Sequence, residues 1–385
     1  MELAQLSGDD PGAVIAALRG MLDGTGPALA IGGPATGAGR AAGAVPDGTG
    51  VVVTTSGSTG IPKSVVLSRA ALEASAAATA ARIGAGAWLL ALPAGYIAGL
   101  QVALRSLRAG HEPVLLPGRF TPDAVRAATD ALPADAPRFT SFVPAQLRTL
   151  LDAAEPGVAE ALRTYDAILV GGQALPVALR ERARDAGIRI VRTYGSTETC
   201  GGCVYDGVPL DGVTVRIAGG EVQLSGPMIA DGYLGDPDRT ARAFPADPDG
   251  TRWYRTGDAG AFDGGTLTVT GRIDNVIVSG GLNVSLDRVE RAVREVPGFA
   301  GAVVVGVPDE RWGEASVVVV ARADAAGTDA DLQRVRDAAA VAIGTHARPS
   351  RLLVVAELPH LSSGKPDRAR IRDLARTPAP ESRMP

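Results

Sequence analysis

A hydroxyl-rich loop, Thr54-Thr-Ser-Gly-Ser-Thr-Gly-Ile-Pro-Lys63, follows a short β-branched run near the start of the chain. Its glycines let the backbone approach a ligand closely, and its hydroxyls and N–H groups can surround phosphate oxygens. A Walker A loop counted from Gly57 would need a second Gly where Pro62 stands, and Pro has no N–H to offer. The loop therefore predicts phosphate binding, but not a P-loop phosphotransferase. Alone, its composition also fits a surface turn.

A second group of polar residues, Tyr194-Gly-Ser-Thr-Glu198, closes a predicted strand. Ligands of α/β sheets bind at the carboxyl ends of the strands. The ring of Tyr194 could stack on adenine there. The oxygens of Thr197 and Glu198 suit phosphate and Mg²⁺, a hard cation that prefers oxygen ligands.

Two further groups occur later in the chain. Trp253-Tyr-Arg-Thr-Gly-Asp258 ends in a carboxylate suited to two vicinal ribose hydroxyls, and Gly271-Arg-Ile-Asp274 adds a guanidinium. Near the C-terminus, Leu361-Ser-Ser-Gly-Lys-Pro-Asp-Arg368 places Lys365 on a turn beside a Gly. Each group alone also fits an ordinary turn, so the inference rests on their order and spacing.

In this order and at these spacings, the motifs resemble those of the acyl-adenylate-forming superfamily. This superfamily includes acyl-CoA synthetases, firefly-luciferase-type enzymes and peptide-synthetase adenylation domains. The resemblance covers about residues 51–371. It implies that ATP activates a carboxylate as an acyl-adenylate, and that coenzyme A then accepts the acyl group. It also implies Mg²⁺ as the metal.

The resemblance implies a role for each matching residue. Lys365, Glu198 and Thr197 are the implied catalytic residues, and the last two also face the metal. The implied ATP-binding residues are Thr55, Ser56, Gly57, Ser58, Thr59, Gly60, Lys63, Gly171, Gly172, Gln173, Tyr194, Gly195, Ser196, Asp258 and Arg272. The implied hinge is Asp274, and the implied CoA-facing residues are Gly280, Gly281 and Asn283.

The choice of acid rests on two segments, 92–105 and 192–211. They resemble the o-succinylbenzoate–CoA ligases of menaquinone biosynthesis in their short actinobacterial form. Such a substrate keeps one carboxylate unreacted, and burying that charge is costly without a counter-charge. Arg105 ends a charge-free run beside the expected acid pocket, which Tyr96 and Gly99 are also expected to line. The alternative is that Arg105 faces solvent on a helix surface.

The pattern of residue types along the chain predicts the helices and strands that position these residues. Short β-rich runs alternate with alanine-rich stretches, which favours parallel α/β layers. The predicted strands are Val51–Thr55, Ser64–Ser68, Trp88–Leu92, Pro113–Leu116, Phe139–Val143, Ala167–Val170 and Ile188–Thr193. The predicted helices are Pro11–Leu22, Ala70–Ile83, Gly99–Ala109, Thr121–Ala131, Ala145–Ala153 and Pro176–Ala186.

After Tyr205 the pattern changes to a small antiparallel β unit, and from about Asp274 to a compact α+β pattern. The predicted fold class is α/β, with a large layered α/β N-terminal domain carrying a small β subunit, plus a small mobile α+β C-terminal domain. We expect the large domain at residues 1–273, with a shortened N-terminal part, and the small one at 274–385. The later predicted strands are Val213–Ala218, Glu221–Ser225, Thr266–Thr270, Val276–Ser279, Ala302–Val307 and Ala315–Val320, and the later predicted helices are Leu286–Val296 and Asp329–Ile343.

Composition narrows the class of protein. The chain has 38 basic and 42 acidic residues, which gives no reason to expect nucleic acid or an anionic membrane as a partner. The charge-free run from Ile83 to Leu104 is long enough for a membrane span, but its Gly and Pro favour a strand, a turn and a buried helix instead. The start of the chain lacks the features of a signal peptide, and a cytoplasmic protein is expected.

The two cysteines, Cys200 and Cys203, are too few for a disulfide scaffold. Their spacing also occurs in redox and zinc motifs, but the three histidines are scattered, so packing behind the acid pocket is favoured. The expected partners are an aromatic acid, ATP and CoA, and a homodimer is left open. The alternatives are another aryl- or acyl-CoA ligase and a non-catalytic adenylate-binding module.

Overall fold

The computed structural model describes residues 3–32, 45–55, 62–153, 155, 157–322, 327–361 and 364–376. The chain divides into two compact units. The larger unit comprises Met1–Leu175, Leu179–Thr256 and Phe262–Thr268, and the smaller one comprises Pro176–Ala178, Gly257–Ala261 and the described part of Val269–Pro385. Each unit is described below by itself.

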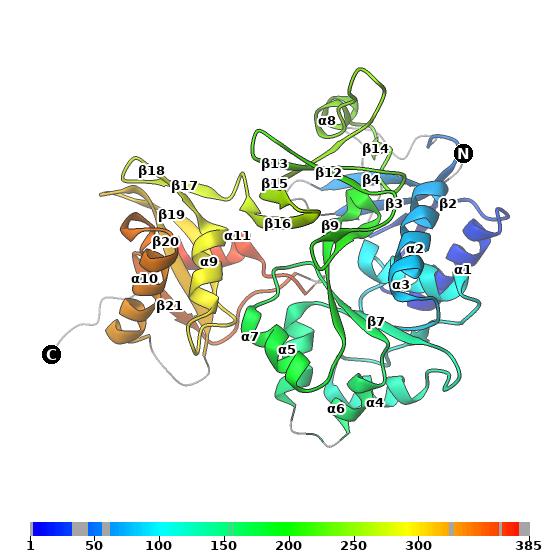
Figure 1. Ribbon diagram of the computed structural model, residues 1–385, viewed down its shortest axis with the longest axis horizontal. Helices are drawn as coiled ribbons and strands as arrows, with labels where there is room; N and C mark the ends of the chain where they lie inside the picture. Colours follow the sequence, from blue (N-terminus) through cyan, green and yellow to red (C-terminus); the bar gives the residue numbers. More distant parts are fainter. Residues whose placement is uncertain are drawn as a thin grey trace. The chain divides into compact units, whose positions relative to one another are not determined.

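The first sheet of the larger unit holds the strands on both sides of the phosphate loop (Figure 1). Its order is β1 (Leu3–Leu6), β2 (Ala28–Ile31), β3 (Thr49–Thr55), β4 (Lys63–Ser68) and β14 (Gly232–Tyr233). The first three strands are parallel, whereas β4 runs antiparallel to β3. The parallel arrangement expected from the alternation of strands and helices therefore does not extend to β4. The link between β3 and β4 is too short for the crossover that a parallel pair needs.

The second sheet forms the centre of the larger unit. Its order is β11 (Val208–Pro209), β10 (Gly201–Tyr205), β9 (Ile190–Ser196), β8 (Ala167–Val170), β7 (Arg138–Phe142), β5 (Ala87–Leu90) and β6 (Val114–Leu115). The strands from β9 to β6 are parallel, and β10 returns antiparallel to β9. The parallel expectation therefore holds for this sheet up to its β10 edge.

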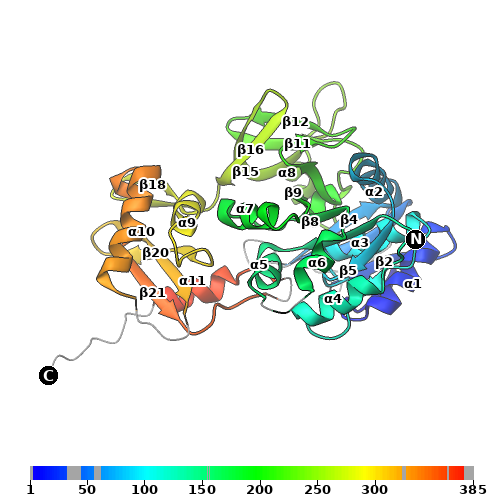
Figure 2. The same ribbon diagram turned by 60° about the horizontal axis from the view of Figure 1, so that its bottom comes forward.

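Helices cover both faces of this second sheet. One face buries alternate strand residues such as Leu89, Phe142 and Ile168 against Leu147 and Leu162. The helices on that face are α4 (Pro122–Asp130), α5 (Pro144–Asp152), α6 (Val158–Arg163) and α7 (Val177–Asp185), of which α4, α5 and α6 gather beside the sheet in Figure 2. The other face carries α2 (Arg69–Ile83) and α3 (Ile97–Arg108), and α1 (Pro11–Leu22) lies next to α3.

The charge-free run from Ile83 to Leu104 forms β5, a turn and the buried start of α3, as the Gly and Pro residues indicated. Trp88 in β5 is 1% exposed and donates its backbone N–H to Ser106 Oγ at 3.2 Å, which joins α3 to the sheet. Among the described residues, no helix combines the length and the apolar character that crossing a membrane requires.

A third, antiparallel sheet has the order β12 (Thr214–Ala218), β13 (Glu221–Ser225), β15 (Tyr254–Asp263) and β16 (Thr266–Arg272). The long strands β15 and β16 contribute residues to both units. A short helix, α8 (Pro237–Ala243), precedes β15 and begins after the N-cap residue Asp236, whose side chain accepts a hydrogen bond from the Arg239 N–H.

The smaller unit is an α+β fold around one sheet. The sheet order is β18 (Leu282–Ser285), β17 (Val276–Ser279), β20 (Gly313–Ala321) and β19 (Val303–Asp309), with β21 (Arg351–Val355) parallel to β20. One face packs on α9 (Leu286–Arg294) and α10 (Asp329–Ala342), and the other packs on α11 (Arg368–Arg376). The predicted α/β class, with its small β unit and its α+β C-terminal part, is confirmed.

Candidate active site

A tight turn after β9 positions Glu198. Residues Thr197–Thr199 form a single 3₁₀ turn, in which the Ser196 N–H donates to Thr199 Oγ1 at 2.8 Å. The Thr199 hydroxyl in turn donates to the Gly201 carbonyl at 2.7 Å. Glu198 is 2% exposed, and its backbone carbonyl accepts from the Ala230 N–H at 2.8 Å. The carboxylate is therefore fixed at the edge of the sheet where the sequence placed it.

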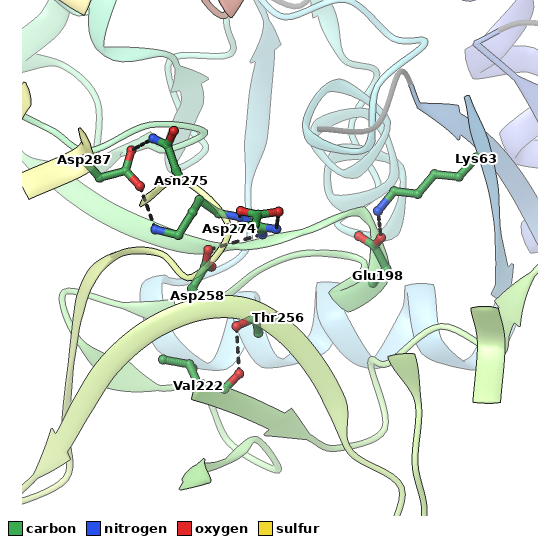
Figure 3. Close-up of polar contacts among 9 residues, drawn as sticks. Lys63, Glu198, Val222, Thr256, Asp258, Asp274, Asn275 and Asp287 are labelled. Carbon is green, nitrogen blue, oxygen red and sulfur yellow. Dashed lines mark hydrogen bonds and ion pairs between the residues drawn. The ribbon is translucent and has the colours of Figure 1, made fainter. Parts of the chain in front are cut away.

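Lys63 is the counter-ion of Glu198. Its ammonium forms an ion pair with Glu198 Oε1 (Figure 3). The same oxygen also accepts a 3.0 Å hydrogen bond from the Tyr233 hydroxyl. Burial acts to raise the pKa of Glu198, but it is outweighed by the charge and hydrogen bond of Lys63 together with smaller hydrogen-bond contributions from the backbone and from Ser196. The pKa of Glu198 consequently lies below its ordinary value, so the carboxylate is ionised at neutral pH.

Replacing Lys63 with methionine should leave a buried carboxylate without its counter-ion. Removing one partner of a buried pair typically costs 3–5 kcal/mol, and because Lys63 is partly exposed we expect about 3 kcal/mol of lost unfolding free energy. Denaturant unfolding measures this loss. The double variant Lys63→Met/Glu198→Gln should recover most of it, because a neutral amide can still meet the Tyr233 hydroxyl. Equal stability of Lys63→Met and the parent protein would contradict the pairing.

Tyr233 is a site residue that sequence analysis missed. Its ring lies 5.3 Å from the Lys63 ammonium and 5.0 Å from the Arg239 guanidinium. It reaches Glu198 because β14 pairs with β4 and places Tyr233 opposite Val65. A strand of two residues leaves no periodic signal, so only the pairing of distant segments shows this contact.

Six of the implied ATP-binding residues lie at one edge of the second sheet. Gly171, Gly172 and Gln173 follow β8, whereas Tyr194, Gly195 and Ser196 belong to the end of β9. These strands are parallel neighbours, so their carboxyl ends meet at the same edge. A Cβ on Gly195 would lie 2.0 Å from the Gly201 carbonyl oxygen, so only glycine fits between β9 and β10.

Arg105 is buried in the larger unit, and the alternative that it faces solvent is wrong. Arg105 is 8% exposed, its guanidinium lies 5.4 Å from the Trp88 ring centre, and its buried Nε has no hydrogen-bond partner. One turn earlier, Gln101 is 1% exposed and its Oε1 is also without a partner. Two neighbouring polar groups on one face of α3 thus keep hydrogen-bonding capacity that the described chain does not use.

Tyr96 and Gly99, the other expected acid-pocket residues, lie where α3 begins. Tyr96 is the N-cap residue and Gly99 lies in the first turn. A Cβ on Gly99 would lie 2.2 Å from the Pro93 carbonyl oxygen, so the glycine lets the helix start close to the preceding turn.

In the smaller unit, Arg272 joins the implied ribose carboxylate to the implied hinge (Figure 3). Its Nη1 lies 3.4 Å from Asp258 Oδ1, and its Nε and Nη2 donate to the two Asp274 oxygens at 2.9 Å each. Hydrogen bonding by Arg272 lowers the pKa of Asp274. Asp287 also holds this segment, since it accepts from the Arg272 N–H at 2.7 Å and from the Asn275 side chain at 2.8 Å.

The remaining predicted residues of the smaller unit lie in the β17–β18 hairpin and on the turn that carries Lys365. Gly280 and Gly281 form the turn between β17 and β18, and Asn283 pairs with Val278 across that hairpin. Lys365 is exposed, and its backbone carbonyl accepts from the Leu361 N–H at 2.8 Å. The whole chain has only two lysines, Lys63 and Lys365, and both lie in the predicted motifs.

The phosphate loop is described only at its ends. Thr55 closes β3 with a buried Oγ1 that has no hydrogen-bond partner in the described chain, and Lys63 opens β4. The other predicted loop residues, Ser56, Gly57, Ser58, Thr59 and Gly60, lie outside the described residues.

The two cysteines are free and fully buried. Burial raises the pKa of both thiols, to about 12 for Cys203, so they stay protonated. Within the described ranges no group of three or more His, Cys, Asp or Glu residues could hold a metal ion. These observations favour the packing interpretation of Cys200 and Cys203 over a redox or zinc site.

Comparison with known proteins shows the family of the chain. Residues 29–234 match the model of the AMP-binding enzyme family, and residues 288–365 match that of the AMP-binding enzyme C-terminal domain. The chain belongs to the AMP-binding enzyme family.

One relative and two solved structures are similar to this chain over most of its length. A probable 2-succinylbenzoate–CoA ligase of Mycobacterium tuberculosis strain H37Rv is 40% identical over 368 residues, which is 92% of this chain and 93% of the relative. The o-succinylbenzoate CoA synthetase MenE of Bacillus subtilis, solved with the acyl-adenylate intermediate OSB-AMP, is 27% identical with a TM-score of 0.71, covering 85% of this chain and 69% of the other. The amide bond synthetase McbA of Marinactinospora thermotolerans is 28% identical with a TM-score of 0.74, covering 97% and 80%.

Proposed function

We propose that this enzyme converts 2-succinylbenzoate to its CoA thioester with ATP, as a step of menaquinone biosynthesis. The class, an AMP-forming acid–CoA ligase, follows from the family and from the relatives named for this activity. The identity of the acid rests on one observation above all. Arg105 is a buried guanidinium with an unused Nε, which suits a substrate that brings a second, unreacted carboxylate into the larger unit.

The reaction proceeds in two displacements. In the first, a carboxylate oxygen of the acid attacks the α-phosphorus of ATP and pyrophosphate leaves. In the second, the thiolate of CoA attacks the carbonyl carbon of the mixed anhydride and AMP leaves. The first step brings two anions together, so cations at the reacting phosphate stabilise the charge that develops in the transition state. We assign that task to Lys365, with Lys63 at the outer phosphates.

The other site residues hold the nucleotide. Asp258 accepts from the ribose hydroxyls, with Arg272 keeping its carboxylate in place, and Tyr194 covers the adenine ring. Gly280, Gly281 and Asn283 face CoA once the small domain turns about Asp274. The two displacements need different faces of the small domain at the reacting group, so the domain must rotate about a hinge between them.

Glu198 and Thr197 are proposed to face Mg²⁺, and the residues present suit that ion. Mg²⁺ at nucleotide sites binds through one or two carboxylates plus the substrate phosphates, and Glu198 supplies one ionised carboxylate. When bound, the ion would neutralise phosphate charge. Lys63 now occupies Glu198 Oε1, so we expect it to move onto the phosphates when the nucleotide binds.

The test is a panel of acids scored for ATP-dependent pyrophosphate release, with and without CoA. We expect release with 2-succinylbenzoate, and formation of AMP and the CoA thioester when CoA is added. Release with a monocarboxylate but none with 2-succinylbenzoate would refute the choice of acid and leave the class intact. No release with any acid would favour the non-catalytic alternative. A cytoplasmic location and a homodimer stay predictions.

A further inference from the structure

An ion cluster around a buried carboxylate in the smaller unit lies next to the segment that carries Lys365. Its centre is Glu290 on α9, which is 5% exposed. Arg368 donates through Nη2 to both carboxylate oxygens of Glu290, at 2.9 and 2.7 Å, and through Nη1 to the Val304 carbonyl at 2.9 Å. Arg294 pairs with the same carboxylate at 2.8 Å. The Val304 N–H adds a fourth contact at 2.9 Å.

The Lys365 segment is anchored on both sides. Backbone contacts join the residues before Lys365 to those after it: the Asp367 N–H donates to the Pro359 carbonyl at 2.9 Å, and His360 forms a β-bridge with Pro366. Downstream, Arg368 is the first residue of α11 and follows Lys365 by one turn of chain. Two side-chain contacts hold that start: Asp367 Oδ1 accepts from the Arg370 N–H at 3.1 Å, and Arg368 bonds to Glu290 and to the Val304 carbonyl. The Arg368 contacts are the ones that tie the helix start to α9 and β19, and the apolar packing of α11 begins later, at Ile371.

Helix packing alone does not account for this ion cluster. Replacing a buried ion pair with apolar residues of similar size is often neutral or stabilising, so such a pair contributes little net stability. The forked contact of Arg368 instead fixes its direction, because Nη2 meets the Glu290 carboxylate while Nη1 of the same rigid guanidinium meets the Val304 carbonyl. The cluster therefore sets where α11 begins and how the backbone leaves Lys365.

We propose that Glu290, acting through Arg368, is a positioning residue that holds the Lys365 turn in the geometry needed for adenylation. This inference rests on the role proposed above for Lys365. A misplacement of about 1 Å can cost up to 10²-fold in rate, so a loosened turn should slow the adenylation step. Thioester formation, assigned to a different face of the smaller unit, should be spared.

The presence of only two lysines makes the position of Lys365 directly observable. Reductive methylation with ¹³C-formaldehyde labels Lys63, Lys365 and the α-amino group, which can be assigned with Lys→Arg variants. In Glu290→Gln we expect the Lys365 NMR signal to shift and sharpen toward that of a free side chain, while the Lys63 signal stays in place. An unmoved Lys365 signal would overturn the inference.

Kinetics on the unlabelled enzyme separate positioning from stability. In Glu290→Gln we expect pyrophosphate exchange to fall roughly tenfold to a hundredfold, with the KM for ATP within twofold of the parent. Thioester formation from the synthetic acyl-adenylate should change less than twofold. A proportional fall in both half-reactions would overturn the inference, because a merely structural role would produce it.

Two further variants protect the test. Arg368→Lys keeps the charge but loses the forked geometry, so it should reproduce the kinetic effect even if Glu290→Gln folds poorly. Asp331→Asn removes a comparable pair, with Arg322 at 2.8 Å in the same unit, and should leave the Lys365 signal and adenylation unchanged. An equal effect of Asp331→Asn would overturn the inference. If the Lys365 signal moved while Lys365→Ala adenylated normally, the proposed function of Lys365 would fail instead.

Discussion

Lys365→Ala is expected to slow acyl-adenylate formation by on the order of 10²-fold or more, because the variant loses the cation that meets the charge building at the α-phosphate. Binding of ATP should change much less, since this contact matters in the transition state. The rate is measured as pyrophosphate exchange dependent on 2-succinylbenzoate. Thioester formation from the synthetic acyl-adenylate should remain near the parent rate, because that step needs no attack on phosphorus.

The control for this prediction is Arg370→Ala. Arg370 is an exposed cation on α11, five positions beyond Lys365. The Arg370→Ala variant therefore removes the same charge from the same part of the smaller unit. It should adenylate at nearly the parent rate. If both variants lost activity equally, the effect would come from the overall electrostatic potential of the small unit and not from a specific contact of Lys365. If Lys365→Ala also lost thioester formation, the assignment of Lys365 to the adenylation half-reaction alone would be wrong.

The second large effect is expected at Arg105. Arg105→Met fills similar space without a charge, so α3 should keep its packing against Trp88 while the ring carboxylate of 2-succinylbenzoate loses its partner. Removing one side of a buried charged pair costs 2–5 kcal/mol, so kcat/KM for 2-succinylbenzoate should fall on the order of 10²- to 10³-fold. For 3-benzoylpropionate, which lacks the ring carboxylate, it should stay the same or rise.

Arg108→Ala is the matched control on the same helix. Arg108 has a 42% exposed side chain and pairs with Glu73 at 3.6 Å, so its loss should change neither substrate by more than about twofold, as for other surface pairs. The diagnostic quantity is the ratio of kcat/KM for the two acids. If that ratio were the same in the parent and in Arg105→Met, Arg105 would not recognise the second carboxylate, and another aryl- or acyl-CoA ligase would become the better interpretation.

Much of the fold could be predicted because the signals are local. Helix Pro11–Leu22 and strand Ala167–Val170 have the predicted bounds, and most other predicted elements differ by only a few residues at their ends. Elements without a periodic signal were missed, such as the two-residue β14 and the short α6. The antiparallel pairing of β4 with β3 was not predicted either, because alternation of strands and helices does not show how two neighbouring strands pair.

For the candidate site, the sequence by itself predicted which residues would carry the chemistry. A phosphate loop, a carboxylate at a strand end and a lysine on a late turn are each recognisable from a few consecutive residues. This is possible because each of these side chains stands at a strand end or on a turn, and short sequence patterns mark such positions. Order and spacing then gave the family. The types of residue and the class of reaction therefore needed no tertiary structure.

Only the tertiary structure decided which of these residues meet. Lys63 and Glu198 are 135 positions apart, and their pairing depends on packing of the first sheet beside the end of β9. The burial of Arg105 depends on α3 lying against Trp88, and the link from Glu290 to Arg368 spans 78 positions. Contacts of this kind arise when distant segments exclude water together, and no short stretch of sequence records them.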